Sequence, residues 1–260
     1  MREFFNSLKI QKNVIGALLM REIVTRYGRS NLGFLWLFLE PLLVILLVAL
    51  GWGVARRSGS SGISVFEFMI SGYPIMMMWR ISASRCLGAI DANEGLLFHR
   101  NIRVLDVFIA RVLLEFAGAT ISFVLLLVIF YFSGLVAEPY DLLYMVFAWV
   151  LMGVFSLGLG ATLGVVTSLS ELAMRIWKAF SVLLMFSSGA FYFVDALPKA
   201  AQNLVLHIPM VHGTEMFRHG YFGARLKTHE DVMFLVIADI VLVLLGLSLT
   251  RWYSQRGHSG

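Results

Sequence analysis

The sequence predicts an all-α integral membrane protein with six transmembrane helices. Apolar residues make up 59% of the 260-residue chain and charged residues 14%, whereas soluble domains average about 45–50% and about 25%. Apolar runs long enough to cross a hydrocarbon core of about 30 Å recur along the chain. Because these runs lack the period-2 alternation of barrel strands, helices are the expected spanning elements.

We expect one transmembrane domain over residues 1–260, which begins with an interfacial segment and ends with a cytosolic tail. The apolar runs lie at 32–54, 65–90, 107–132, 142–167, 176–193 and 232–250. The domain therefore divides into residues 1–31 (cytosolic and interfacial helix), 32–193 (spans 1 to 5), 194–231 (external segment), 232–250 (span 6) and 251–260 (cytosolic tail).

The basic residues predict the orientation of the spans. With the amino end in the cytosol, the cytosolic segments hold about twice as many lysines and arginines as the external ones, as the positive-inside rule requires. Both termini are then cytosolic. The net charge is +5, but the basic residues flank spans instead of forming a stripe on a soluble domain, so no nucleic-acid partner is expected. The early apolar patch at 14–20 is too short for a signal peptide.

An amphipathic helix is predicted just before the first span. At 100° per residue, polar and apolar side chains between positions 20 and 29 fall on opposite sides. The polar side holds Arg21, Glu22, Thr25, Arg26 and Arg29, and the apolar side holds Met20, Ile23, Val24 and Tyr27. Such a helix lies in the headgroup layer in contact with membrane lipid. The pattern fits a plain anchor and a docking surface equally well.

The stretch that contains this helix, "REIVTRYGRSNLGFLWLFLEP" at 21–41, resembles the entry signature of type-2 ABC exporter permeases. In that family an interfacial helix ends in Arg-Tyr-x-x-Ser-x-Leu-Gly and leads into a first span with Trp and Pro. The resemblance covers the whole chain as a six-span pattern. The segments 39–41 and 209–223 are similar to the branch that exports bacterial capsular polysaccharide, although Ile208-Pro209 stands where many relatives have Asn-Pro.

The resemblance implies the permease subunit of an ATP-driven exporter in the bacterial inner membrane. A homodimer would bind two nucleotide-binding ATPase subunits and pass lipid-linked capsular polysaccharide to periplasmic and outer-membrane export proteins. The chain has no GxxxxGK[ST] loop, so ATP and Mg are expected on the partner ATPase and no cofactor on this chain.

Other functions remain open at this point. Within the same family the cargo can be another polymer, such as O-antigen or teichoic acid. An ion-coupled secondary transporter would use Glu115 or Asp239 as its coupling carboxylate, and an integral-membrane transferase would use an external histidine as base. Internal repeats with matching broken spans, typical of secondary transporters, are not evident.

The loop between the second and third spans, "DANEGLLFHRNIRVLDV" at 91–107, places an apolar knob among charges, which suits insertion into a pocket on a partner. The resemblance implies a coupling helix seated in the ATPase subunit. Its candidate residues are Glu94, Gly95, Leu96, Leu97, Phe98, His99 and Arg100. The alternative is a cytosolic turn whose charges satisfy one another.

A polar stripe on the second span is the candidate translocation pathway. Arg80 lies near the middle of the run, where an arginine costs about 2.5–3.5 kcal/mol on insertion, so it should face water, protein or a counter-charge. Tyr73, Met77, Arg80 and Ser84 share one helical face. Arg85, nearer the cytosol, and the outer aromatic Trp52 complete the set. The alternative is an ion pair of Arg80 with Glu40, Glu115 or Asp239.

The external segment 194–231 holds prolines and apolar pieces of about ten residues, which are too short to span but long enough to enter the membrane and return. The resemblance implies re-entrant helices that form an outer gate, with His212, Glu215, Arg218 and Tyr221 as candidate residues. The histidines lack metal-ligand spacing, so no metal site is expected. Glu215 is expected to pair with Arg218 or His219 at helical spacing.

Overall fold

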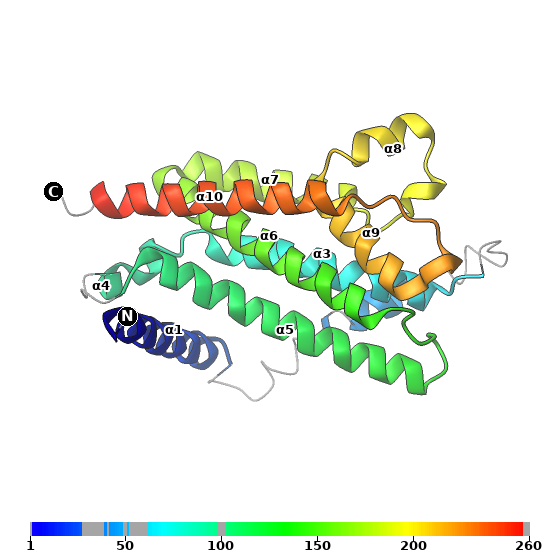
Figure 1. Ribbon diagram of the computed structural model, residues 1–260, viewed down its shortest axis with the longest axis horizontal. Coiled ribbons are helices and arrows are strands. Elements are labelled where there is room, and N and C mark those ends of the chain that lie inside the picture. Colours follow the sequence, from blue (N-terminus) through cyan, green and yellow to red (C-terminus); the bar gives the residue numbers. More distant parts are fainter. Residues whose placement is uncertain are drawn as a thin grey trace.

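The computed structural model describes residues 2–27, 39–40, 42–48, 51, 62–97 and 102–256. Regular structure in these ranges is helical throughout, which confirms the all-α prediction. The long helices run side by side, with both chain termini at one end of the molecule and the short helices α8 and α9 at the other (Figure 1). We call these the terminal end and the α9 end.

Three helices are long and apolar enough to cross a membrane in the described part of the chain. They are α5 (Val104–Phe132), α6 (Leu142–Leu169) and α10 (Val232–Arg256). Each covers one of the predicted spans at 107–132, 142–167 and 232–250. The Asp141 carboxylate accepts from the Tyr144 backbone N–H and so caps the start of α6.

Two further helices occupy predicted spans but are less apolar or shorter. Helix α3 (Val65–Cys86) carries charged residues and an internal proline, and it starts with a capping box in which Ser64 and Glu67 bond each other's backbone N–H. Helix α7 (Glu171–Ser187) has 17 residues and lies several residues before the predicted run at 176–193. In the predicted first span, residues 39–40, 42–48 and 51 are helical. The count of six spans therefore stays a prediction.

The amino-terminal helix α1 (Arg2–Tyr27) is longer than the amphipathic stretch at its end. It packs beside α5 at the terminal end (Figure 1). A short 3-10 turn, η1 (Asp91–Asn93), and helix α4 (Glu94–Leu97) follow α3 at the same end. A small apolar cluster that includes Leu18, Cys86 and Phe108 joins these elements.

The segment between α7 and α10 contains η2 (Val194–Ala196), α8 (Lys199–Val205), α9 (Pro209–Phe222) and η3 (Gly223–Arg225). Proline at the first position of α9 is favourable because that position needs no N–H donor. Helix α9 inserts against α3, α6 and α10, and most of its side chains are buried. It thus contributes to the larger core, together with residues such as Trp79, Met152 and Phe155.

Candidate functional site

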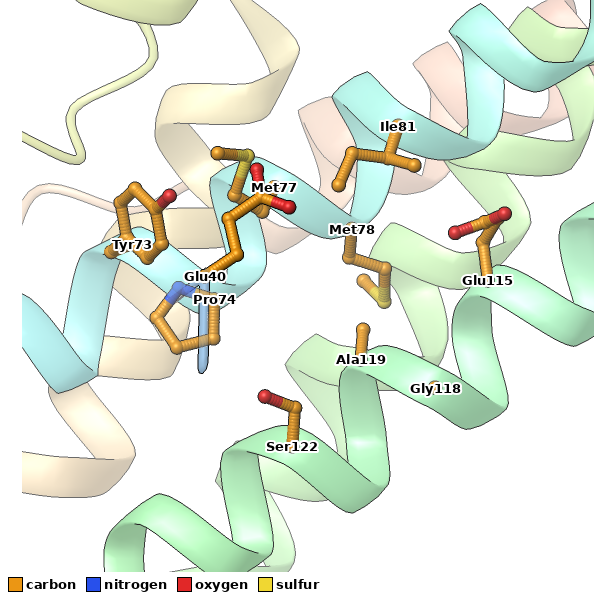
Figure 2. A pocket seen from close by; sticks show the side chains of 10 residues that line it. All are labelled: Glu40, Tyr73, Pro74, Met77, Met78, Ile81, Glu115, Gly118, Ala119 and Ser122. Atoms are coloured by element: carbon orange, nitrogen blue, oxygen red, sulfur yellow. The ribbon is translucent and has the colours of Figure 1, made fainter. Parts of the chain in front are cut away.

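A cavity between the helical residues near position 40, α3 and α5 contains part of the predicted pathway stripe (Figure 2). Tyr73 and Met77 of α3, Glu115 and Ser122 of α5, and Glu40 are among the residues that line it. Its volume is about 80 Å³, enough for a few water molecules. A sugar polymer therefore does not fit in this cavity in the present conformation.

Two carboxylates line this cavity. Figure 2 shows Glu40 beside Met77 and Pro74, whereas Glu115 lies on the far side beyond Met78. The Nε atom of Arg85 is 3.3 Å from Oε1 of Glu115, so Arg85 supplies a counter-charge for Glu115. The structure therefore places Arg85, a predicted pathway residue, at the edge of the cavity as an ion-pair partner.

Arg80 is partly buried on the same helix, and its Nε atom has no hydrogen-bond partner in the described ranges. No ion pair joins Arg80 to Glu40, Glu115 or Asp239 there, although all four residues are described. Ser84 is exposed, and Trp52 lies outside the described residues. Of the predicted stripe, Tyr73 and Met77 are thus the members that line the cavity.

Polar contacts at the terminal end join α1 to α5 and to the turn after α3. Arg21 donates to Asn93 Oδ1 at 2.6 Å, and Arg111 Nε lies 3.0 Å from Oε1 of Glu22. Arg111 also donates to the backbone carbonyl of Arg85 at 2.6 Å. We call these bonds the terminal-end contacts. They connect η1 to α1, α1 to α5, and α5 to Arg85 of the Arg85–Glu115 pair beside the cavity.

The remaining predicted residues of the interfacial helix lie near its end. Arg26 and Tyr27 are the last two residues of α1. Arg29 lies outside the described residues. The apolar side chains of Met20 and Val24 are 61% and 60% exposed, so an apolar surface is available for lipid on this helix. Its location in the headgroup layer remains a prediction.

The predicted coupling segment is divided between exposed and packed residues. Glu94 and Gly95 are exposed. Leu96 and Leu97 are half-buried and pack against the small apolar cluster at the terminal end. Phe98, His99 and Arg100 lie outside the described residues. The two leucines of the predicted knob therefore contribute to the chain's own core, and a contact of this segment with a partner stays a prediction.

Arg218 of α9 is fully buried and is the centre of a polar cluster at the α9 end. Its guanidinium donates to the backbone carbonyls of Gly189 and Tyr192, each at 2.6 Å, and of Ala190 at 3.0 Å. The rings of Phe68 and Phe193 lie 4.9 and 4.8 Å from its Cζ atom. Burial lowers the pKa of Arg218 to about 10, so it stays charged at neutral pH. The hydrogen bonds of Arg218 hold α9 against the connection that follows α7.

The other predicted gate residues are also buried and bonded. Glu215 Oε1 lies 3.7 Å from Arg218 Nη1, which confirms the predicted pair, and Oε2 accepts from the His229 backbone N–H. Burial raises the pKa of Glu215. His212 Nδ1 accepts from the Asp231 N–H, so its Nε2 donates to the Leu206 carbonyl. Tyr221 donates to the Ala137 carbonyl. In this conformation these side chains join the connections between helices.

The family model described as ABC-2 type transporter matches residues 13–222. The chain belongs to the ABC-2 type transporter family. This confirms the family predicted from the entry stretch. The ABC-2 permease is the membrane subunit, and the ATPase is a separate subunit.

Three relatives show how far the similarity of this ABC-2 permease extends. It is 48% identical over 252 residues to the capsule polysaccharide export inner-membrane protein CtrC of Neisseria meningitidis serogroup A, and 47% identical over 252 residues to BexB of Haemophilus influenzae, which carries the same description. Each alignment covers 97% of this chain and 95% of the relative. The polysialic acid transport protein KpsM of Escherichia coli is 30% identical over 248 residues, which is 95% of each chain.

An ion pair between Arg225 and Glu67, which the sequence did not predict, lies at the α9 end of the permease. Arg225 donates to both carboxylate oxygens of Glu67 at 3.1 and 3.2 Å. The Glu67 carboxylate also accepts from Ser64 and Ala137 N–H groups. The Ser-x-x-Glu spacing at 64–67 indicates the capping box, but the pair with a residue 158 positions away has no local signal.

The Glu22–Arg111 contact predicts a measurable coupling between α1 and α5. In a double-mutant cycle with Glu22→Gln and Arg111→Gln, we expect the two losses in unfolding free energy to be non-additive by about 1 kcal/mol, because both side chains are mostly buried. The measurement is thermal or denaturant unfolding of the permease in detergent. Glu171 and Arg175 form the matched control, since that pair is 79–90% exposed and should show about 0–0.5 kcal/mol. Additive losses at Glu22 and Arg111 would contradict the contact.

Proposed function

We propose that this ABC-2 permease moves lipid-linked capsular polysaccharide across the bacterial inner membrane. The observation that carries the proposal is near-full-length identity of 47–48% with two proteins described as capsule polysaccharide export inner-membrane proteins. The relative that carries polysialic acid in its description supports the same class of cargo. A permease described for O-antigen export, RfbA of Myxococcus xanthus, is 24% identical, and this lower identity supports capsular polysaccharide over O-antigen as the proposed cargo.

The proposed assembly is a homodimer of six-span subunits with both termini in the cytosol and one ATPase subunit beneath each copy. The α9 end then faces outward, with 194–231 as a re-entrant external segment, and passes the polymer to periplasmic and outer-membrane export proteins. A conduit between the two copies is supported by the small volume of the cavity within one chain. Arg80, Ser84, Arg85 and Trp52 are its proposed lining, and Tyr73 and Met77, which line the cavity within one chain, would join it only after a rearrangement of α3.

The proposed coupling begins at the exposed residues Glu94 and Gly95, which the ATPase subunit contacts. ATP binding closes the ATPase pair and displaces this segment. Because the terminal-end contacts tie η1 and α1 to α5, the displacement reaches the Arg85–Glu115 pair beside the cavity. ATP and Mg stay on the ATPase subunits throughout.

Deletion of the gene in an encapsulated host tests the function directly. We expect the surface capsule to disappear and the polymer to accumulate in the cytosol, and the wild-type chain should restore export. A normal capsule after deletion, or loss of a different surface polymer, would contradict the cargo. Export that continues after the phosphate-loop lysine of the partner ATPase is replaced would contradict ATP as the energy source.

The coupling contact gives a separate prediction. Among the described residues, a Cβ atom at Gly95 meets no atom beyond its own helical segment within 4 Å, so Gly95→Trp should leave the fold of this chain intact. We expect it to abolish co-purification of the ATPase subunit, because the indole would occupy the contact surface. Lys199→Trp, at an exposed position of the opposite end, is the control and should keep the ATPase bound. Normal ATPase binding by Gly95→Trp would place the contact elsewhere.

A further inference from the structure

An open cleft at the α9 end lies apart from the cavity between α3 and α5. It is formed by the connection between α5 and α6, by the last turn of α9 and by the connection between α9 and α10. Its volume is about 580 Å³, within the range of about 300–1,000 Å³ typical of ligand sites. The cleft is therefore large enough for a ligand and lies outside the apolar part of the long helices.

One wall of the cleft is an aromatic ring held in a fixed position. Tyr140 is 74% exposed, yet its backbone N–H bonds the Tyr221 carbonyl, and the next N–H bonds the Gly220 carbonyl. Its ring lies against Gly223, where a Cβ atom would be 2.6 Å from Cγ of Tyr140. Gly223 also has φ +53°, a value that favours glycine. The backbone bonds and the contact with Gly223 thus restrict the position of the ring before any ligand arrives, which lowers the entropy cost of binding.

Hydrogen-bonding groups also line this cleft. His219 Nδ1 is 2.6 Å from Oε1 of Glu230 and 3.1 Å from Oγ1 of Thr228. Lys227 is 71% exposed, with Nζ 3.9 Å from the Asp195 carboxylate. The cleft therefore combines one flat apolar face with a donor, an acceptor and a cation, which is the set that a hydroxyl-rich ring with an acidic substituent requires.

We propose that this cleft binds a short saccharide segment of the exported polymer on the outer side of the membrane. A sugar ring stacks its C–H face on Tyr140, its hydroxyl groups bond Thr228 and His219, and an acidic group of the polymer meets Lys227. A lipid phosphate is a poorer ligand because it has no flat face to stack on the Tyr140 ring. The inference rests on the proposed function and adds a site that retains each emerging segment and opposes its return.

The test uses the complete permease–ATPase complex in nanodiscs of zwitterionic lipid. The probe is a set of short oligosaccharides obtained by partial hydrolysis of the capsule that the deletion experiment identifies. Saturation-transfer NMR should show contact of the sugar ring protons with wild-type protein. We expect Tyr140→Ala to lower affinity by roughly tenfold and Tyr140→Phe to keep it, since the ring supplies the contact. Lys227→Gln should weaken acidic oligosaccharides more than neutral maltotetraose.

Three outcomes would overturn the inference: no binding to wild type, equal binding by Tyr140→Ala, or displacement of the probe by added phosphatidylglycerol, which would indicate a lipid site. Thermal unfolding of each variant separates lost binding from lost folding, and Tyr140→Phe provides a variant that should fold normally. Capsule restoration by the wild-type chain is scored independently. If it succeeds while the probe does not bind the cleft, only this inference fails.

Discussion

Replacement of Arg218 by alanine is expected to lower the free energy of unfolding by about 3–5 kcal/mol, because it leaves the buried Glu215 carboxylate without its counter-charge. Three backbone carbonyls in the connection after α7 also lose their donor. Since domains are stable by about 5–15 kcal/mol, this loss is a large share of the total stability, and the level of the variant in the membrane should fall. Thermal unfolding of the detergent-purified protein and its membrane level measure the effect.

A second substitution added to Arg218→Ala tests whether the unpaired Glu215 carboxylate causes the loss of stability. Glu215→Gln added to Arg218→Ala should recover part of the loss, because the unpaired carboxylate is gone. Arg175→Ala is the control for removal of an arginine, since Arg175 is 79% exposed, and should change stability by less than about 0.5 kcal/mol. If Arg218→Ala unfolds at the wild-type temperature, Arg218 does not hold α9 in place.

The pH dependence of the Arg218→Ala variant follows from Glu215. Burial raises the pKa of Glu215 in the folded state, so protonation favours the folded protein relative to the unfolded chain, and this contribution is lost as the pH rises through the folded-state pKa. Without Arg218 nothing on α9 offsets that burial. The difference between variant and wild type should therefore shrink as the pH is lowered, and an unchanged difference would contradict the role of Glu215.

The sequence predicted α5, α6 and α10 well because a continuous apolar run is a local property. Helix α7 begins earlier than its apolar run because Ser170 caps it, a signal that an apolarity search does not weigh. The entry stretch predicted the family, but its helix extends back to Arg2 over residues without strong periodicity. Local pattern therefore located the elements, and capping residues decided several of their ends.

The candidate site was less predictable because its contacts join distant parts of the chain. Helical spacing predicted that Glu215 pairs with Arg218 or His219, and the structure shows Arg218, but the three carbonyls that bind Arg218 are 26 to 29 residues away. Glu115 was named as a candidate partner for Arg80, and in the structure it pairs with Arg85. The sequence is compatible with a pair between Glu115 and either arginine. Only the packing of α3 against α5 determines which arginine reaches the carboxylate.

Replacement of Gly158 by alanine is expected to push α6 away from α10. A Cβ atom at Gly158 would lie 2.8 Å from the Val243 backbone nitrogen and 2.9 Å from the Leu242 carbonyl carbon. Backbone atoms of a packed helix cannot move aside as a flexible side chain can, and small residues are what allow such helices to approach in a membrane. Overpacking of this kind costs about 1–3 kcal/mol, and Gly158→Leu should cost more.

Gly16 in α1 offers the same substitution without the contact, because a Cβ atom there would meet nothing within 4 Å. Alanine is the better helix former by about 0.8–1.0 kcal/mol, so Gly16→Ala should raise the unfolding temperature while Gly158→Ala lowers it. Both substitutions replace a helical glycine by alanine. Stability changes of opposite sign would therefore separate the effect of the α6–α10 contact from the effect of helix propensity. If both variants become more stable, the two backbones have room to separate, and the close packing of α6 on α10 does not contribute to the stability of the permease.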